Sequence, residues 1–247
     1  MSSNPIGIVG AMPEEVAQLK ADLVNPHAVT AYGRDFFCGE LEGRSVVLVQ
    51  GGIGKVRTTI TAMALCEKFK VQGMMFTGVA GGLKPHLNMG DVVLGNHATE
   101  HDFGTATDGD FTLGISFIPD EGPRVARASD SMLKCAMSLR DQVEMTPLPG
   151  HPHPKVIEGT FASGDSFVEC ASLKERIIRL TDADAVEMEA AAFLRVAMDA
   201  GVPSLLIRTI SDGGDSTDFE TFLHAAAHNS YVMVKELMKH PDLLADK

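Results

Sequence analysis

Basic residues are scarce in this sequence. It has 21 Lys and Arg residues against 33 Asp and Glu residues, which gives a formal net charge of -12. Binding to nucleic acid or to an anionic membrane surface depends on clustered basic side chains. The charge balance therefore argues against both kinds of partner, and it leaves neutral or cationic small molecules as ligands.

Long apolar runs and cysteine pairs are also missing. No window approaches the roughly 18 uninterrupted apolar residues of a membrane-spanning helix, and the start, MSSNP, has neither the basic residues nor the apolar stretch of a signal peptide. The cysteines are widely spaced without a CxxC pair, which favours reduced thiols over disulfides or a zinc site; they are Cys38, Cys66, Cys135 and Cys170. We therefore expect a cytoplasmic protein.

Phosphate-binding and metal-binding fingerprints are missing too. Two glycine-rich stretches, GGIGK at 51–55 and TGVAGG at 77–82, follow predicted strands and allow close approach of the backbone to a ligand. Neither matches GxxxxGK[ST] or GxGxxG, so each remains either a tight turn or a ligand contact. His151 and His153 have no carboxylate or cysteine at ligand spacing, so no metal site is predicted.

Strands and helices alternate along the rest of the chain. Buried strand-like runs are predicted at 6–12, 73–78, 91–96, 155–163 and 204–210, and helices at 56–68, 124–140, 172–180, 190–200 and 219–239, with another opening at Pro13. Two further strands, 32–41 and 45–50, read as a hairpin. This order predicts a three-layer α/β/α fold around a central mixed, largely parallel twisted sheet, with an antiparallel excursion near residues 30–50. The length suits one domain over residues 1–247.

Residues 100–121 depart from this alternation. Gly, Asp and Thr dominate there, and the aromatic residues Phe103, Phe111 and Phe117 are isolated. Long loops inside compact domains are often functional. The three rings fit either a pocket on a partner or burial against their own core.

Acidic residues follow three of the predicted strands, and ligands bind at the carboxyl ends of strands in α/β proteins. Glu15 lies in a first helical turn, where it is either a glutamate stabilised by the helix dipole or a general base. Asp212 ends the strand 204–210, either as a turn cap or as a proton donor that Ser211 orients by hydrogen bonding.

The third acidic group is the segment VEMEA at 186–190. Glu187 and Glu189 share a face if the strand continues through both. A carboxylate there suits hydrogen bonding to sugar hydroxyls. The alternative is a salt bridge to Arg208 on a neighbouring strand, which we favour for Glu187.

With these motifs placed, the chain resembles the 5'-methylthioadenosine/S-adenosylhomocysteine nucleosidases of the nucleoside phosphorylase/hydrolase superfamily. The matching motifs run in order over nearly the whole chain: GIVGAMPEEV from Gly7, GGIGKV from Gly51, TGVAGGL from Thr77, GD from Gly90, HD from His101, FASGDSFV from Phe161, AVEMEAAA from Ala185, RTISD from Arg208 and FETFL from Phe219.

The resemblance implies a role for each matching position. The catalytic base falls on Glu15 and the acid on Asp212. Ribose binding falls on Met188 and Glu189, the purine slot on Phe167 and Val168, and placement of the attacking water on Arg208. Other pocket positions are matched by Ala11, Met12, Ile53, Gly81 and Phe219. The resemblance also implies no metal or organic cofactor, a place in methionine salvage, and a homodimer in which the 100–121 loop lies near the neighbouring active site.

Three departures from the family pattern bear on these expectations. Pro13 replaces a usual glutamate, which leaves Glu15 in place. Val79 stands where relatives often carry a serine near the water. The loop 104–121 does not align, and in relatives it caps the 5'-alkylthio pocket, so the preferred 5'-substituent is left open.

The implied activity is hydrolytic cleavage of adenine from 5'-methylthioadenosine and/or S-adenosylhomocysteine, with 5'-deoxyadenosine as a further candidate, through an oxocarbenium-like transition state. One alternative is a purine nucleoside phosphorylase, which would carry arginines around phosphate. Another is a futalosine or aminofutalosine hydrolase of menaquinone synthesis. A non-catalytic nucleoside-binding module is disfavoured because all three carboxylate positions are present together.

Overall fold

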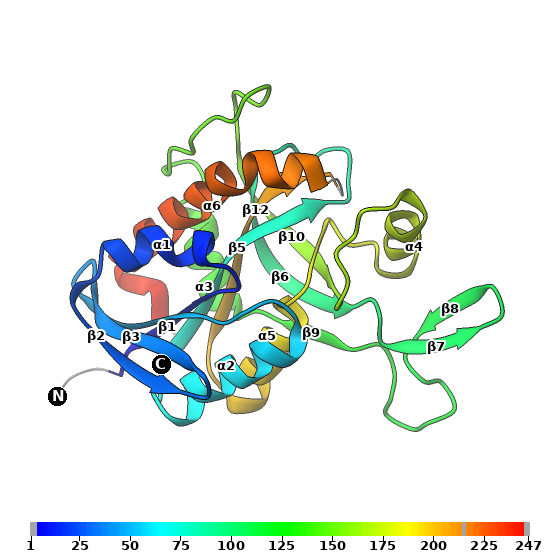
Figure 1. Cartoon of the computed structure of the whole chain (residues 1–247), viewed down its shortest axis with the longest axis horizontal. Coiled ribbons are helices and arrows are strands. Elements are labelled where there is room, and N and C mark those ends of the chain that lie inside the picture. Colours follow the sequence, from blue (N-terminus) through cyan, green and yellow to red (C-terminus); the bar gives the residue numbers. More distant parts are fainter. Residues whose placement is uncertain (1–3, 214–215, 245–247) are drawn as a thin grey trace.

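A mixed sheet forms the centre of the computed structural model, which describes residues 4–213 and 216–244 (Figure 1). In spatial order its strands are β11 (Ala185–Glu187), β10 (Val156–Ser163), β6 (Val92–Glu100), β12 (Ser204–Asp212), β5 (Gly73–Gly82), β1 (Ile6–Gly10), β4 (Arg44–Gln50), β3 (Arg34–Leu41) and β2 (Val24–Ala31), and β9 (Val125–Arg127) pairs with β6. Within these described residues, no helix has both the length and the apolar character to cross a membrane.

Parallel pairing dominates the middle of the sheet. β1 runs parallel to β4 and β5, and β5 runs parallel to β12. The predicted antiparallel excursion is confirmed, because β2, β3 and β4 form consecutive antiparallel pairs. The turn between β3 and β4 lies at Glu42 and Gly43, as predicted, and both residues have the positive φ that a tight hairpin turn requires (50° and 75°).

The sheet also closes on itself next to the carboxyl ends of its central strands. β11 pairs in parallel with β10 through Phe161 and Ala185, and antiparallel with the end of β5 through Val186 and Gly81. Both edges of this short strand are therefore hydrogen-bonded, and the segment VEMEA is fixed between two longer strands.

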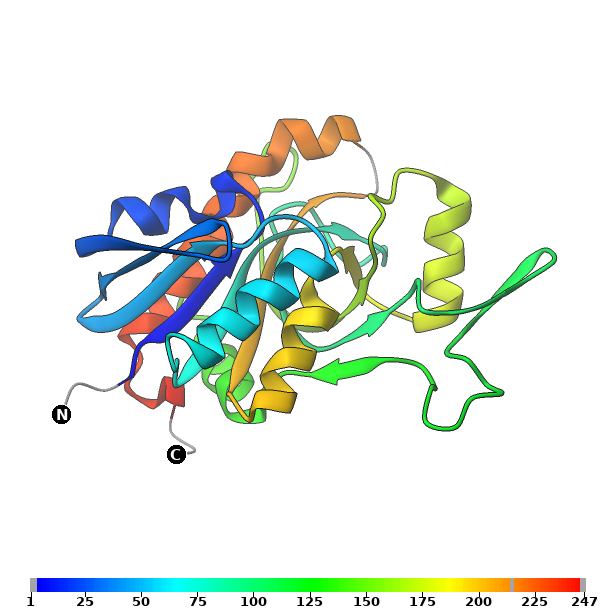
Figure 2. The ribbon, with the colours of Figure 1, turned by 60° about the horizontal axis from the view of Figure 1, so that its bottom comes forward.

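Helices cover both faces of the sheet, which confirms the three-layer prediction. One face packs against α2 (Lys55–Glu67) and α5 (Ala190–Ala200); the other packs against α1 (Pro13–Ala21), α3 (Asp130–Ser138) and α6 (Ser216–Lys239) (Figures 1 and 2). The alternation along β4 shows how the strands serve both layers, since Val47 and Val49 join the first cluster and Val46 and Leu48 the second.

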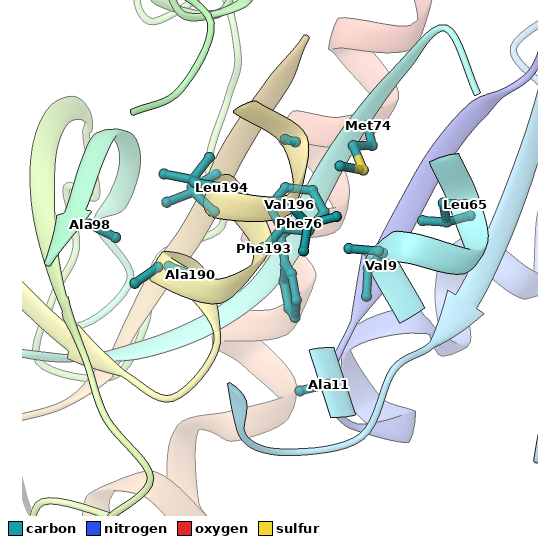
Figure 3. Close-up of a cluster of buried hydrophobic side chains, with 14 of the residues drawn as sticks. Val9, Ala11, Leu65, Met74, Phe76, Ala98, Ala190, Phe193, Leu194 and Val196 are labelled. Atoms are coloured by element: carbon teal, nitrogen blue, oxygen red, sulfur yellow. The ribbon is translucent and has the colours of Figure 1, made fainter. Parts of the chain in front are cut away.

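The first of these cores contains the aromatic packing of the protein's centre. The ring of Phe76 on β5 meets that of Phe193 on α5 edge to face, with centroids 5.2 Å apart (Figure 3). Val9 of β1 and Leu65 of α2 lie in the same cluster. Edge-to-face pairs of this kind add about 0.5–1.5 kcal/mol to the burial of their surface, and they fix α5 against the sheet.

Two sequence predictions were wrong in detail, and one strand was missed. The stretch TGVAGG is not a loop but the end of β5, because its buried backbone pairs with β12 and β11. The predicted helix 124–140 starts only at Asp130, and Val125–Arg127 is strand β9. Strand β2 was not predicted at all.

The loop 100–121 contains a small hairpin that projects from the body of the protein, formed by β7 (Gly104–Thr107) and β8 (Asp110–Leu113) (Figure 2). Phe103 lies 3.4 Å beneath the guanidinium of Arg124, and Phe111 faces the guanidinium of Arg176 on α4 (Ala171–Thr181). Phe117 remains 77% exposed in this chain. Two of the three aromatic rings therefore pack on arginines of their own chain.

The C-terminal end of α6 is held by Arg44 of β4. The Nε of Arg44 donates to the carbonyl of Met238 at 2.7 Å, and its Nη2 donates to the carbonyl of His240 at 2.6 Å. The carbonyl of Met238 lies in the last turn of α6, where a helix leaves carbonyls without intrahelical partners, and His240 directly follows the helix. We expect Arg44→Ala to lower the free energy of unfolding by about 1–3 kcal/mol and to leave catalysis unchanged.

Thermal and denaturant unfolding would measure this loss. The matched control is Arg140→Ala, which removes an exposed arginine that forms an ion pair with the adjacent, exposed Asp141. Equal stability of the two variants would contradict the assigned role of Arg44.

Candidate active site

A cavity opens where the carboxyl ends of β1, β5, β11 and β12 meet. All of the site residues proposed from the sequence line it: Ala11, Met12, Glu15, Ile53, Gly81, Phe167, Val168, Met188, Glu189, Arg208, Ser211, Asp212 and Phe219. Residues that the proposed set omitted also line it: Val79, Ala80, Ser166, Val186 and Glu187. Each of these five omitted residues lies inside a motif that the sequence analysis singled out. Their position next to proposed site residues could therefore have indicated that they line the cavity.

Glu15 is fixed by backbone donors from two strand ends. Its Oε2 accepts hydrogen bonds from the amides of Ala11 (2.6 Å) and Met12 (2.9 Å), and its Oε1 accepts one from the amide of Val79 (3.0 Å). The residue is 2% exposed. Burial raises the pKa of Glu15, while Arg208 and the backbone donors oppose that rise. The carboxylate therefore keeps one orientation at the cavity floor.

Gly78 permits this arrangement. A Cβ at that position would lie 2.5 Å from Nη1 of Arg208 and closer still to Oε1 of Glu15. Its φ of +153° also lies outside the range that L side chains prefer. β5 must lack a side chain at this residue for the Glu15 carboxylate and the Arg208 guanidinium to meet.

Arg208 binds three carboxylates from the middle of the site. Its Nη1 donates to Glu15 Oε1 at 3.4 Å, and its Nη2 donates to Glu187 Oε2 at 2.9 Å and to Glu189 Oε2 at 3.0 Å. The guanidinium lies 4.4 Å above the ring of Phe76 and is 1% exposed. A fully ionised cluster therefore carries two more negative than positive charges, which favours a cation in the cavity.

The surroundings of Glu189 raise its pKa. Burial, followed by repulsion from Glu187, raises the pKa of Glu189 to about 7, against the opposing effect of Arg208. Its Oε1 accepts a hydrogen bond from the amide of Gly54 at 2.8 Å. Glu189 therefore takes up a proton close to neutral pH.

Glu187 has a structural role. Its Oε2 accepts from Arg208 and from the amides of Glu189 (2.8 Å) and Ala190 (2.7 Å), and its Oε1 accepts from the hydroxyl of Ser163. The predicted salt bridge between Glu187 and Arg208 is confirmed. Glu187 also caps α5, which accounts for the end of β11 at this residue.

The condition for a face shared by Glu187 and Glu189, a strand that continues through both, is not met. The strand stops at Glu187, and Glu189 is the N-cap residue of α5. Both carboxylates still reach Arg208, one from the strand end and the other from the helix start.

Asp212 enters the cavity from the end of β12. The register of β12 against β5 shifts between Ile210 and Asp212, which sets Asp212 opposite Gly81. The hydroxyl of Ser211 donates to Asp212 Oδ2 at 2.8 Å, as predicted. A Cβ on Gly81 would lie 3.1 Å from Asp212 Oδ1, so glycine leaves space for this carboxyl group.

Aromatic and aliphatic side chains form the mouth of the cavity. Phe167 and Phe219 meet edge to face with centroids 5.3 Å apart, and Phe167 is 47% exposed. Val168, also in the lining, is buried, whereas Ile53 is half exposed. An apolar mouth above a polar floor suits a ligand with one flat face and one hydroxylated part. Across residues 4–213 and 216–244, no group of three or more His, Cys, Asp or Glu side chains could hold a metal ion.

Comparisons with known proteins identify the family. The model of the phosphorylase superfamily matches residues 5–239. The chain is 33% identical over 244 residues to the 5'-methylthioadenosine/S-adenosylhomocysteine nucleosidase of Shewanella halifaxensis, covering 95% of this chain and 98% of that protein.

Solved structures agree with this assignment. A mutant of the Helicobacter pylori nucleosidase with 5'-methylthioadenosine in its active site is 30% identical, has a TM-score of 0.83, and covers 95% of this chain and 97% of its own. Futalosine hydrolase of the same organism is also 30% identical, with a TM-score of 0.81 and coverage of 94% and 98%. The chain belongs to the phosphorylase superfamily and, within it, to the family of the 5'-methylthioadenosine/S-adenosylhomocysteine nucleosidases.

Proposed function

We propose that this protein is a hydrolytic N-glycosidase that releases adenine from 5'-methylthioadenosine and/or S-adenosylhomocysteine. The observation that carries the proposal is the convergence of Glu15, Asp212 and Glu189 in one cavity with Arg208. The names of the relatives point to the same reaction.

Asp212 is the proposed acid. Adenine leaves poorly as an anion, so a proton given to N7 assists departure of the base. The hydroxyl of Ser211 donates to Oδ2 of Asp212, and Oδ1 lies on the side of the carboxyl group that faces Gly81. The apolar mouth with Phe167 would stack on the purine and keep N7 within reach of this group.

Glu189 and Met188 are proposed to bind the ribose. As the glycosidic bond lengthens, the ribose becomes cationic, and the surplus negative charge around Arg208 stabilises that cation. Glu189 accepts hydrogen bonds from the sugar hydroxyls, and the Met188 thioether lies against the sugar.

Glu15 is the proposed base. Its carboxylate is oriented by the amides of Ala11, Met12 and Val79, and Arg208 contacts the same group. A water molecule held there would lose a proton to Glu15 as it attacks the anomeric carbon. In this proposal Glu15 removes a proton from the attacking water while Asp212 supplies one to the leaving base, the division of labour between two carboxyl groups that inverting glycosidases use.

Water is favoured over phosphate as the nucleophile. Arg208 is the one basic side chain among the described residues that line the cavity, and it already binds three carboxylates. A phosphate dianion would be repelled by Glu15 and would find no free guanidinium. The competing activity, a purine nucleoside phosphorylase, therefore lacks its anion site here.

Adenine release from 5'-methylthioadenosine, measured with and without inorganic phosphate, tests this choice. We expect equal rates in both conditions and free 5-methylthioribose as the sugar product. Strict dependence on phosphate, with a sugar phosphate as product, would overturn the hydrolytic reading.

A futalosine hydrolase remains the second candidate because a structural neighbour with a TM-score of 0.81 has that activity in its name. The two activities differ in the 5'-substituent. Rates on 5'-methylthioadenosine, S-adenosylhomocysteine, 5'-deoxyadenosine and futalosine would separate them, and highest efficiency on futalosine would favour the second candidate.

The proposal extends to a homodimer in the cytoplasm that serves methionine salvage, with the 100–121 loop near the neighbouring active site. Val56, Ile60 and Met63 support the dimer, because they lie on one face of α2 and are 71%, 40% and 44% exposed. We expect sedimentation to give a dimer and Ile60→Asp to shift it towards monomer. A wild-type monomer at micromolar concentration would contradict the dimer.

The protonation of Glu189 predicts a pH dependence. A neutral Glu189 is a weaker hydrogen-bond acceptor and carries no charge to stabilise the cationic ribose, so kcat/KM should fall about tenfold per pH unit on the acid side of the raised pKa, about 7. The acid limb should flatten in Glu189→Gln. If kcat/KM of the wild-type protein were constant between about pH 5 and 8, Glu189 would not be the group that controls the acid limb.

The raised pKa of Glu189 affects stability in the opposite direction, since acid pH lowers activity but favours the folded state. Because the pKa of Glu189 in the folded protein lies above its ordinary value of 4.5, the folded state binds more protons than the unfolded state between 4.5 and about 7. The contribution of Glu189 to stability is fully present below that interval and is lost as pH rises through it.

A further inference from the structure

Two consecutive amides at the start of α2 bind two different carboxylates. The amide of Gly54 donates to Glu189 Oε1 at 2.8 Å, and the amide of Lys55 donates to Asp165 Oδ1 at 2.8 Å. Gly54 has a φ of +95°, and a Cβ on it would lie 3.0 Å from Asp165 Oδ1. The orientation of Glu189 thus depends on a glycine whose neighbour along the chain is held by Asp165.

Asp165 is itself part of a closed ring of interactions. Its amide donates to Asp102 Oδ2 at 2.8 Å, and Asp102 Oδ1 accepts from Lys55 Nζ at 2.5 Å. Lys55 Nζ also donates to Glu100 Oε2 at 2.9 Å. The side chains of Lys55 and Asp102 are 17% and 30% exposed, so this ion pair is better sheltered than most surface pairs. We call Lys55, Asp102 and Asp165 the α2 ring.

The α2 ring connects three segments that are distant in sequence. Lys55 opens α2, Asp102 follows β6, and Asp165 precedes the segment 166–168 that lines the purine side of the cavity. No member of the ring lines the cavity itself. The ring therefore links the ribose side and the purine side of the site from outside it.

We propose that Asp165, supported by Asp102 and Lys55, is a positioning residue for Glu189. By accepting from the amide of Lys55, Asp165 fixes the peptide bond between Gly54 and Lys55. This fixes the position of Gly54, whose own amide orients the Glu189 carboxylate. This inference rests on the proposed function, in which Glu189 accepts from the ribose hydroxyls. It requires that the effect of Asp165 on catalysis pass through those hydroxyls.

A comparison of two substrates isolates that effect. Asp165→Ala should lower kcat/KM for 5'-methylthioadenosine about tenfold, because a misplaced carboxylate loses a directed hydrogen bond. For 2',3'-dideoxy-5'-methylthioadenosine, which lacks the hydroxyls that Glu189 would bind, the loss should stay within about twofold on the same grounds. A general loosening of the fold would lower both rates alike.

Two further variants serve as controls. Asp165→Asn should recover most of the activity, because its amide oxygen can accept from the amide of Lys55. Glu67→Gln makes the matching change of carboxylate to amide at the other end of α2, where Glu67 is 65% exposed and pairs with Lys70. This control should behave as wild type on both substrates.

A double variant gives an independent reading. When Glu189→Gln has already removed the carboxylate, adding Asp165→Ala should produce less than about a twofold further loss, because two residues that act through one interaction are not additive.

The possible results separate the two proposals. Equal losses on both substrates, no loss on either, or full additivity in the double variant would overturn the positioning role while wild-type hydrolysis stands. Failure of the wild-type protein to cleave 5'-methylthioadenosine would instead remove the proposed function, and the positioning role with it.

Discussion

The variant Asp212→Asn is expected to release adenine about 10²–10⁴-fold more slowly than the wild-type protein, since that is the usual contribution of a general acid. Asparagine has nearly the same shape and can still accept the hydrogen bond from Ser211, which in the native protein goes to Asp212 Oδ2 at 2.8 Å. It cannot give a proton to N7. The loss should therefore appear in kcat, with binding of 5'-methylthioadenosine retained.

Adenine release followed by chromatography, together with calorimetric titration of the nucleoside, measures the two quantities separately. Asp199→Asn is the matched control, because Asp199 is 69% exposed on α5 and lies outside the cavity. The expected loss for an acid catalyst is about 10²–10⁴-fold. If Asp212→Asn turned over within about tenfold of the control, Asp212 would be excluded as the proton donor.

The variant Glu15→Gln is expected to reduce kcat/KM by about 10²–10⁴-fold, because it removes the proposed base. A second effect follows from the surroundings of Glu15. Both of its oxygens accept from backbone amides, so the NH₂ group of glutamine must face at least one of these donors. A buried amide left without an acceptor costs about 1–3 kcal/mol, and the variant should also be less stable.

Glu14→Gln is the control for this experiment, since it makes the same substitution one residue earlier in the first turn of α1. Steady-state kinetics and thermal unfolding should show a loss of both activity and stability for Glu15→Gln alone. If Glu14→Gln were inactive and Glu15→Gln active, the base would have been assigned to the wrong glutamate.

Much of the fold follows from local signals. Helix α5 begins and ends at the predicted residues, because Gly201 terminates it in the left-handed conformation (φ 64°) and Pro203 cannot continue it. Helix α1 also begins at the predicted residue, because proline is favoured at the first position of a helix and Pro13 occupies it. Strand β2 gave no such signal, since Val24–Ala31 is mostly exposed and contains Pro26.

The features of the site can also be divided into those that the sequence predicted and those that it did not. Motif order was sufficient to bring every proposed residue to the cavity, although their catalytic roles remain predictions. The capping of α5 by Glu187 and the α2 ring could not be foreseen. The ring depends on hydrogen bonds between residues as far apart as 110 positions, and no local pattern along the chain specifies them.

The double pairing of β11 determines how the wall of the cavity moves. A strand of three residues at a free edge would fray within the native state, but β11 is hydrogen-bonded on one side to β10 and on the other to β5. We therefore expect the amides of β11 to exchange with deuterium more slowly than those of a strand of this length that is paired on one edge. The wall that carries Glu187 should accordingly show little local opening in the native state.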